Sequence, residues 1–256
     1  LAHKMVFDAD FGWTETDQPL ARVPQLNEID DNAQEQFRRR LLFNTYGGTL
    51  PATVDPRFYG VRSGVGDAVT SPFHEMMTDQ VALRLGWRHR LQTQVGPANA
   101  LRVKDWMTLD LETVFFPDAD RDNFGESFGV YGARYQWNIS DRTTIQASGQ
   151  FDTFRDAPRT WNLAMLSQRS TRGSVYLGIR NIEGPGLHSE ILSASYSYQM
   201  SDKWVTTLGT AYDIAEQQNR GQSITLTRVG SDFLIHFGTV IDPNKDNFGI
   251  GLYVAP

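Results

Sequence analysis

The sequence predicts an all-β protein, an up-and-down antiparallel transmembrane β-barrel with about 12 strands in this segment. Three observations carry this prediction. Apolar and polar residues alternate with period two over stretches longer than most soluble strands. Turn signals separate these stretches roughly every 10–15 residues. No part of the chain shows the helix–strand alternation of βαβ units.

The composition of the chain excludes several kinds of site and function. The 256 residues carry a net charge of −6 and no cysteine, which excludes internal disulfides and thiolate metal sites. No basic block suits nucleic-acid binding, so we expect no nucleic-acid partner. The longest apolar runs, such as Phe233–Ile241, are far shorter than the roughly 20 residues of a membrane-spanning helix. A membrane-spanning β-strand needs only about 9–11 residues, of which every second one is apolar.

Two stretches show the alternation best. Between Gln80 and Val95 the apolar residues occupy odd positions and the polar residues even positions. Leu101–Phe115 repeats this pattern. Complete alternation returns in 193–200 and continues from Trp204 to Ile214. The remaining predicted strands are 3–14, 124–139, 143–155, 160–169, 173–183, two strands that meet near Gly230, and 247–255.

The turns fall into two classes. Tight turns are predicted at Asp141-Arg142, Thr171-Arg172, Asp202-Lys203 and Gly230-Ser231, and they all lie at one end of the strands. Longer connections lie at the other end, which is the arrangement of outer-membrane barrels with periplasmic turns and extracellular loops. Residues 15–78 break the rhythm and are expected to form a long extracellular or lumenal loop region within a single barrel segment, 1–256.

Asp-Asn-Phe-Gly occurs twice, at 122–125 and 246–249. We expect both copies to be acidic extracellular turns whose Phe-Gly begins a descending strand. Before the first copy, Asp118, Asp120 and Asp122 have the spacing of the first three ligands of a calcium loop. Asn123 and Gly129 stand where that loop needs glycine and glutamate. These aspartates are therefore a weak metal candidate, and no cofactor is expected.

Catalysis has one candidate motif. Gly125–Gly129 matches the G-x-S-x-G nucleophile elbow around Ser127. The elbow requires a strand-to-helix turn. An alternating strand pattern follows here instead, so we expect no enzyme and no catalytic residue.

Lumen-facing polar residues are the other candidates. Arg84, Arg88 and Arg90 share the polar face of their predicted strand, and Asp110 and Glu112 share that of the next. Either these groups pair with one another, or they line a hydrophilic lumen that receives an anionic or sugar-bearing substrate.

Several segments resemble the C-terminal barrel of the LPS-assembly outer-membrane protein family, LptD, also called organic solvent tolerance protein. They are "FRRRLLF", "DPRFYGVRSG", "WRHRLQTQVGP", "VKDWMTLDLETVFFPDADRDNFGE", "SDRTTIQASGQFD", "RGSVYLGIRNIEGP", "ASYSYQMSDKWVTTLG" and the closing stretch from Leu226 to Pro256. The resemblance implies that this chain is the last portion of a larger barrel in the outer membrane. It also implies that the barrel inserts lipopolysaccharide into the outer leaflet through a lateral opening.

The partners implied by this resemblance are lipopolysaccharide, outer-membrane lipid, a plug lipoprotein in the lumen and periplasmic LPS-bridge proteins. The last strand would form one side of the lateral gate, with Phe248, Gly249, Ile250, Gly251 and Leu252 as candidates. The absence of cysteine departs from members of the family that mature through disulfides. The alternatives are a general porin-type outer-membrane channel and a soluble β-sandwich binding module.

Overall fold

The computed structural model describes residues 1–18, 79–153, 157–184 and 187–255, together with isolated positions between 22 and 48. Its strands are β1 (Ala2–Thr14), β2 (Gln80–Val95), β3 (Arg102–Phe115), β4 (Tyr131–Asn138), β5 (Thr143–Asp152), β6 (Ala157–Gln168), β7 (Gly173–Gly184), β8 (Leu187–Ser201), β9 (Trp204–Asp213), β10 (Gln218–Val229), β11 (Leu234–Asp242) and β12 (Asn247–Ala255). A four-residue helix, α2 (Ala119–Asp122), lies between β3 and β4. Most of the loop region predicted at 15–78 lies outside the described residues.

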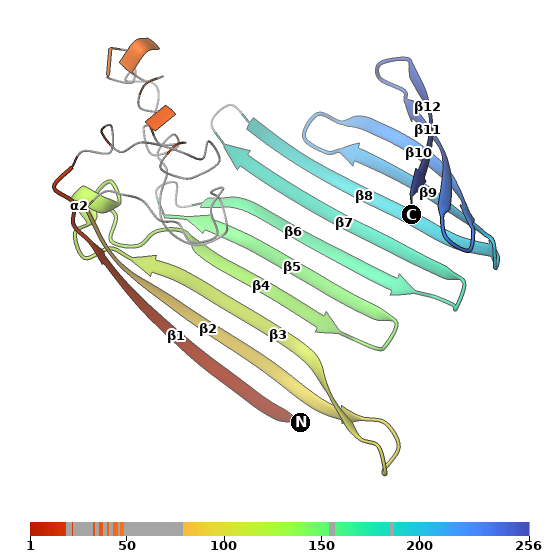
Figure 1. Cartoon of the computed structure of the whole chain (residues 1–256), viewed down its shortest axis with the longest axis horizontal. Coiled ribbons are helices and arrows are strands. Elements are labelled where there is room, and N and C mark those ends of the chain that lie inside the picture. The colour runs from red at the N-terminus through yellow and green to blue at the C-terminus, as the bar shows by residue number, and fades with distance from the viewer. Residues whose placement is uncertain are drawn as a thin grey trace.

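All twelve strands form one sheet in sequence order, and each pairs antiparallel with the next. Figure 1 shows this meander, with α2 at one end of the strands and the tight turns at the other. The predicted fold class is thus confirmed as an antiparallel, up-and-down, all-β sheet of 12 strands. No helix among the described residues is long and apolar enough to cross a membrane.

The sheet is open. Within the described residues β1 pairs only with β2, and β12 pairs only with β11. Every residue of β1, and every residue of β12 except Ala255, is exposed. Both edges therefore present backbone groups that have no partner strand among the described residues.

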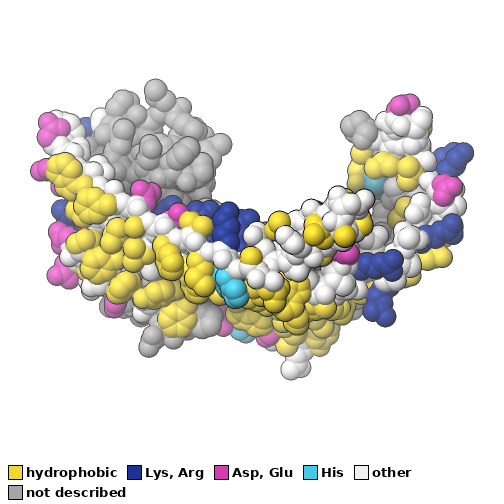
Figure 2. All heavy atoms as spheres, turned by 90° about the horizontal axis from the view of Figure 1, so that it is seen from below, with side chains coloured by type: hydrophobic (Ala, Val, Ile, Leu, Met, Phe, Trp, Pro, Cys, Tyr) yellow, Lys and Arg dark blue, Asp and Glu magenta, His cyan; other side chains and the backbone are white. Residues whose placement is uncertain are grey.

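The strands bend into a trough whose two faces differ in chemistry. In Figure 2 the hydrophobic side chains cover the convex side of the trough. Cross-strand registers show which residues share this face. One row runs Phe7, Trp87, Leu111, Ala133, Gly149 and Trp161, and another runs Val175, Tyr196, Leu208, Ile224, Thr239 and Ile250.

Very few apolar side chains are buried. Among the described residues the buried hydrophobic ones are Leu91, Val114 and Phe116, whereas Phe7, Ile250 and many others are largely exposed. A soluble sandwich would bury one apolar face of its sheet against a second layer. A single-layer sheet with an exposed apolar face is the wall of a membrane barrel, since lipid is the medium that covers such a face. This agrees with the predicted location in the outer membrane.

Several local predictions are corrected. Gly230 donates its N–H to the carbonyl oxygen of Phe233 (2.8 Å), so the two-residue turn is Ser231-Asp232, one residue later than predicted. A bulge after Leu91 pairs Gln92 with Asp105 and skips Trp106. The alternation predicted for Leu101–Phe115 therefore changes face near the turn, because a bulge inserts one extra residue.

The two Asp-Asn-Phe-Gly copies differ in structure. The second copy is a turn followed directly by a strand, as predicted, since Asp246 has a positive φ of 47° and β12 begins at Asn247. In the first copy Asp122 ends α2 and Phe124 has a φ of 55°. The next strand, β4, begins only at Tyr131, so the predicted strand start at 124 is wrong for this copy.

Candidate functional site: the concave face

The concave face of β1–β4 carries a ladder of charges. The register places Val6, Arg88, Asp110 and Arg134 in one row, and Asp8, Gly86, Glu112 and Gly132 in the next. Together with the neighbouring rows, this part of the face holds five positive side chains and five negative ones. They are Lys4, Arg84, Arg88, Arg90 and Arg134, and Asp8, Asp10, Asp105, Asp110 and Glu112.

Arg88 bonds to the edge strand. Its Nη2 donates to Asp8 Oδ2 over 2.6 Å, and its Nε donates to the same oxygen over 3.0 Å. About half of each side chain is exposed on the open face, so the pair remains accessible to a solute. Gly86 lies opposite Asp8 in the register and has no side chain that would separate the two groups.

Arg90 makes the second ion pair of the ladder. Its Nη1 lies 3.4 Å from Asp105 Oδ2, while Gln92 Nε2 donates to Asp105 Oδ1 over 2.7 Å. Asp105 reaches this face because of the bulge at Trp106. Alternation alone places it on the opposite face, which is why the sequence reasoning did not include Asp105.

Arg134 makes the third pair, with Nη2 at 3.8 Å from Glu112 Oε1. Arg84 lies opposite Asp10 and Val114, and it makes no ion pair with a described residue. The predicted lumen residues Arg84, Arg88, Arg90, Asp110 and Glu112 therefore share one face. Their pairing differs from the expectation, because Asp8 and Asp105 take the arginines expected to bind Asp110 and Glu112.

The concave face of β5–β12 is mostly uncharged. Away from the strand ends, Arg180 is the one charged side chain that these strands place there. Hydroxyl and amide groups are the commonest side chains on the rest of this face, beside apolar ones such as Leu166, Val205 and Val240, and several of the polar groups bond to one another. Asn162 Nδ2 donates to Ser148 Oγ over 2.6 Å, Ser197 and Thr207 hydroxyls lie 2.9 Å apart, and Thr227 Oγ1 lies 2.9 Å from His236 Nδ1. This face is therefore a wettable surface with few fixed charges.

The loop between β3 and β4 folds back onto the sheet. Asp122 Oδ2 accepts a hydrogen bond from the Val81 N–H (2.9 Å), and its side chain is only 1% exposed. Asn123 Nδ2 donates to the carbonyl oxygens of Glu126 and Phe128. Hydrogen bonding to Asp122 raises the pKa of Arg121 above its ordinary value. These contacts hold the loop at the loop end of β2 and β3.

The weak metal candidate does not form a cation cage in this arrangement. Arg121 Nε lies 2.6 Å from Asp122 Oδ1 and 3.6 Å from Asp118 Oδ2, so both carboxylates already have a cationic partner. No group of three or more acidic or histidine side chains with the geometry to hold a metal occurs among the described residues. Ser127, the serine of the elbow-like motif, has no hydrogen bond to a histidine in the described part of the chain.

The candidate gate strand is the sheet edge. Phe248, Ile250 and Leu252 lie on the convex side, in the rows of Ile241, Thr239 and Phe237, and Ile250 is 77% exposed. Gly249 and Gly251 lie on the concave side, in the rows of Val240 and Gly238. For these five residues, the structure shows that they lie in β12, at an edge of the sheet.

Comparisons with known proteins do not assign this chain to a family. No family model matches the chain, and no curated protein matches it. The solved structures similar to it include the KdgM porin and the "KdgM porin in complex with disordered oligogalacturonate". The sequence identities are 13% and 14%, the TM-scores are 0.32 and 0.33, and each covers 68% of this chain and 89% of the porin chain. Scores this low support no common substrate.

The expected LptD membership is corrected. The structural neighbours named above are porins, and neither a family model nor a curated protein supports the resemblance. Alternating strands with acidic turns are common to outer-membrane barrels of many kinds, so short similar phrases do not separate one family from another. Lipopolysaccharide, the plug lipoprotein and the LPS-bridge proteins are withdrawn as partners, and so is the lateral gate built on them.

Proposed function

We propose that this chain forms the wall of a porin-type outer-membrane channel, through which small hydrophilic solutes pass along the concave face. The observation that carries this proposal is the division of one sheet into an apolar convex face and a polar concave face over all twelve strands. A membrane channel needs this division, because lipid contacts one side of the wall and water the other.

The charges on the concave face favour a weakly selective channel. The five positive and five negative side chains of β1–β4 balance, and the face of β5–β12 adds mostly hydroxyl and amide groups. A wall without a dominant sign of charge neither concentrates nor repels an ion of one sign. The preferred solutes are therefore uncharged and polar, or small ions of both signs.

The test is conductance of the whole protein, extracted from outer membranes and reconstituted into planar bilayers. Stepwise single-channel currents, and swelling of proteoliposomes in isotonic solutions of small sugars, are the expected results. Bilayers that stay at background conductance while the protein is folded and inserted would overturn the proposal. The reversal potential in a salt gradient should lie close to zero.

A further inference from the structure

A groove crosses the convex face of β1–β6. Its volume is about 740 Å³, and its lining belongs mainly to apolar side chains of that face. The central row of the lining is continuous through the register, from Phe7 across Trp87, Leu111, Ala133 and Gly149 to Trp161. The groove exists because the two central positions of this row have almost no side chain.

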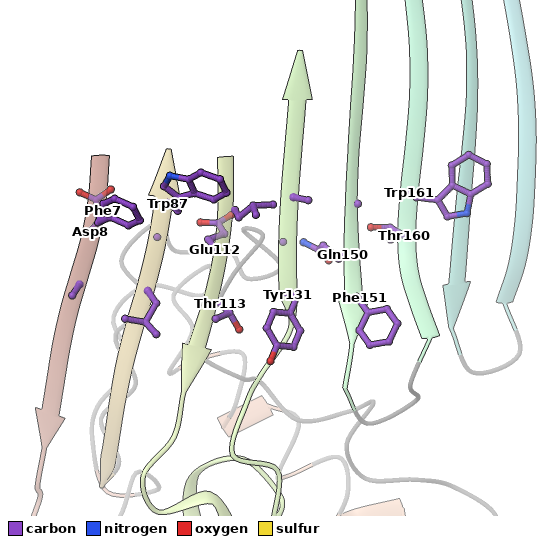
Figure 3. Close-up of a pocket in the computed structure, with 17 residues that line it drawn as sticks. Phe7, Asp8, Trp87, Glu112, Thr113, Tyr131, Gln150, Phe151, Thr160 and Trp161 are labelled. Atoms are coloured by element: carbon purple, nitrogen blue, oxygen red, sulfur yellow. The ribbon is translucent and has the colours of Figure 1, made fainter. Parts of the chain in front are cut away.

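The floor and the walls are formed by different residues. Ala133 and Gly149 form the floor, while Trp87 and Trp161 stand on either side in Figure 3. A Cβ on Gly149 would lie 3.3 Å from the Thr160 carbonyl oxygen and 3.4 Å from Trp161 Cβ. Strand β6 thus lies close beside Gly149 at the Thr160 carbonyl and the Trp161 Cβ, while Ala133 is exposed.

The groove opens to the side of the sheet that faces lipid. The charged residues among its lining, Asp8 and Glu112, belong to the concave rows described above. In Figure 3 the Tyr131 hydroxyl and the Trp161 ring nitrogen point toward the loop end of the strands. Tyrosine and tryptophan take this orientation at the membrane interface, where the polar tip reaches the headgroup layer.

We propose that this groove binds one hydrocarbon chain of an outer-leaflet lipid, with the lipid headgroup at the level of Tyr131 and Phe151. The inference rests on the membrane-wall placement in the proposed function and adds a defined lipid site to it. A hydrocarbon chain fits the chemistry, since the convex side of the groove offers apolar surface and no charge. A second protein copy would need polar groups there to fix its orientation.

The test compares the wild-type protein with two variants, each of which replaces one alanine by phenylalanine. Ala133→Phe fills the groove over its floor. Ala147→Phe adds the same side chain to the same face of the sheet, on the neighbouring strand β5. It lies in the row of Tyr135 and Leu163, outside the groove lining. Each protein is extracted from outer membranes in mild detergent, and the mass of the protein with any bound lipid is measured by native mass spectrometry. The wild type and Ala147→Phe should retain one lipid, and Ala133→Phe should retain at least fivefold less.

Equal lipid retention in the two variants would overturn the proposal. A dimer in the wild type that Ala133→Phe alone dissociates would also overturn it, and would assign the groove to a second copy. If Ala133→Phe does not fold, as judged by migration of unheated samples in gels, Ala133→Leu replaces it.

A second measurement places the chain inside the groove. Lipids with brominated acyl chains quench tryptophan fluorescence at contact, so Trp161→Phe should remove more of the quenching than Trp204→Phe does. Loss of equal amounts in the two variants would contradict the proposed position. Conductance measurements separate this inference from the channel proposal, because Ala133→Phe and Ala147→Phe should both conduct like the wild type. A non-conducting wild type that still retains its lipid defeats the channel and leaves the groove standing.

Discussion

Arg88 and Asp8 join the edge strand to its neighbour on the concave face, with Arg88 Nη2 2.6 Å from Asp8 Oδ2. Both groups remain about half exposed, so water screens the pair and its contribution to folding is small. Its importance lies in the electrostatic balance of the proposed channel.

Asp8→Asn should shift the channel toward anions. The substitution removes one negative charge and leaves the Arg88 guanidinium without its partner on the face that solutes contact. Arg88→Gln should shift it toward cations by the same argument. The measurement is the reversal potential in a tenfold salt gradient. Asp202→Asn, in the tight turn after β8, is the matched control and should leave the potential at the wild-type value. Shifts of the same sign in the two ladder variants would contradict the assignment.

Ile224→Arg and Thr225→Arg should separate the two faces of β10. Ile224 lies on the convex side and is 52% exposed, whereas Thr225 is its neighbour on the concave side. Arginine on the lipid face of a barrel costs about 2–4 kcal/mol at the bilayer midplane, and much less in the lumen. Urea titration in liposomes should therefore show a clear loss of unfolding free energy for Ile224→Arg only. Equal losses would mean that both sides of the sheet contact the same medium.

Asp122→Ala should release the loop between β3 and β4 from β2. The Asp122 carboxylate is almost fully buried and accepts the Val81 N–H. A hydrogen bond to a charged group contributes about 1.5–3 kcal/mol, so exchange of the Val81 amide with deuterium should accelerate by roughly tenfold or more. Asp118→Ala removes an exposed carboxylate of the same loop and should leave that amide protected. Unchanged exchange in Asp122→Ala would show that the loop is held by other contacts.

The ion pair between Lys104 and Asp141, in the turn after β4, should weaken in acid. Hydrogen bonding to Lys104 lowers the pKa of Asp141 below its ordinary value. A carboxylate whose pKa is lowered in the folded state stabilises that state above its unfolded pKa of about 3.9, and the contribution is lost as the pH falls through the folded pKa. Carbon-13 NMR of the Asp141 carboxyl should give a pKa below that reference, and Lys104→Met should return it to the ordinary range.

Alternation alone predicted most of the fold. The strands 80–95, 143–155 and 173–183 could be placed because an apolar face repeats at every second residue. The tight turns at Asp141-Arg142 and Thr171-Arg172 were located correctly, because a short polar stretch that begins with serine separates two alternating segments at each place. The turn near Gly230 was shifted by one residue, because two neighbouring dipeptides had suitable composition.

The candidate site was predicted less completely. The arginines of β2 could be assigned to one face, but their partners could not, since pairing depends on register and on the bulge at Trp106. Asp8 lies far from Arg88 in sequence, and only strand pairing brings the two together. The burial of Phe116 could not be predicted either, because it depends on the loop between β3 and β4 turning back at Asn123. The groove could not be foreseen, because Ala133 of β4 and Gly149 of β5 create it only once the register has aligned them.

The two open edges also bear on how the protein is made. Within the described residues β1 and β12 each present a row of amide and carbonyl groups without strand partners, and each such group costs several kcal/mol inside hydrocarbon. The sheet therefore cannot enter the bilayer interior as an independent unit. Both edges therefore have to find strand partners before or during entry into the bilayer, so the edges constrain the order of biogenesis.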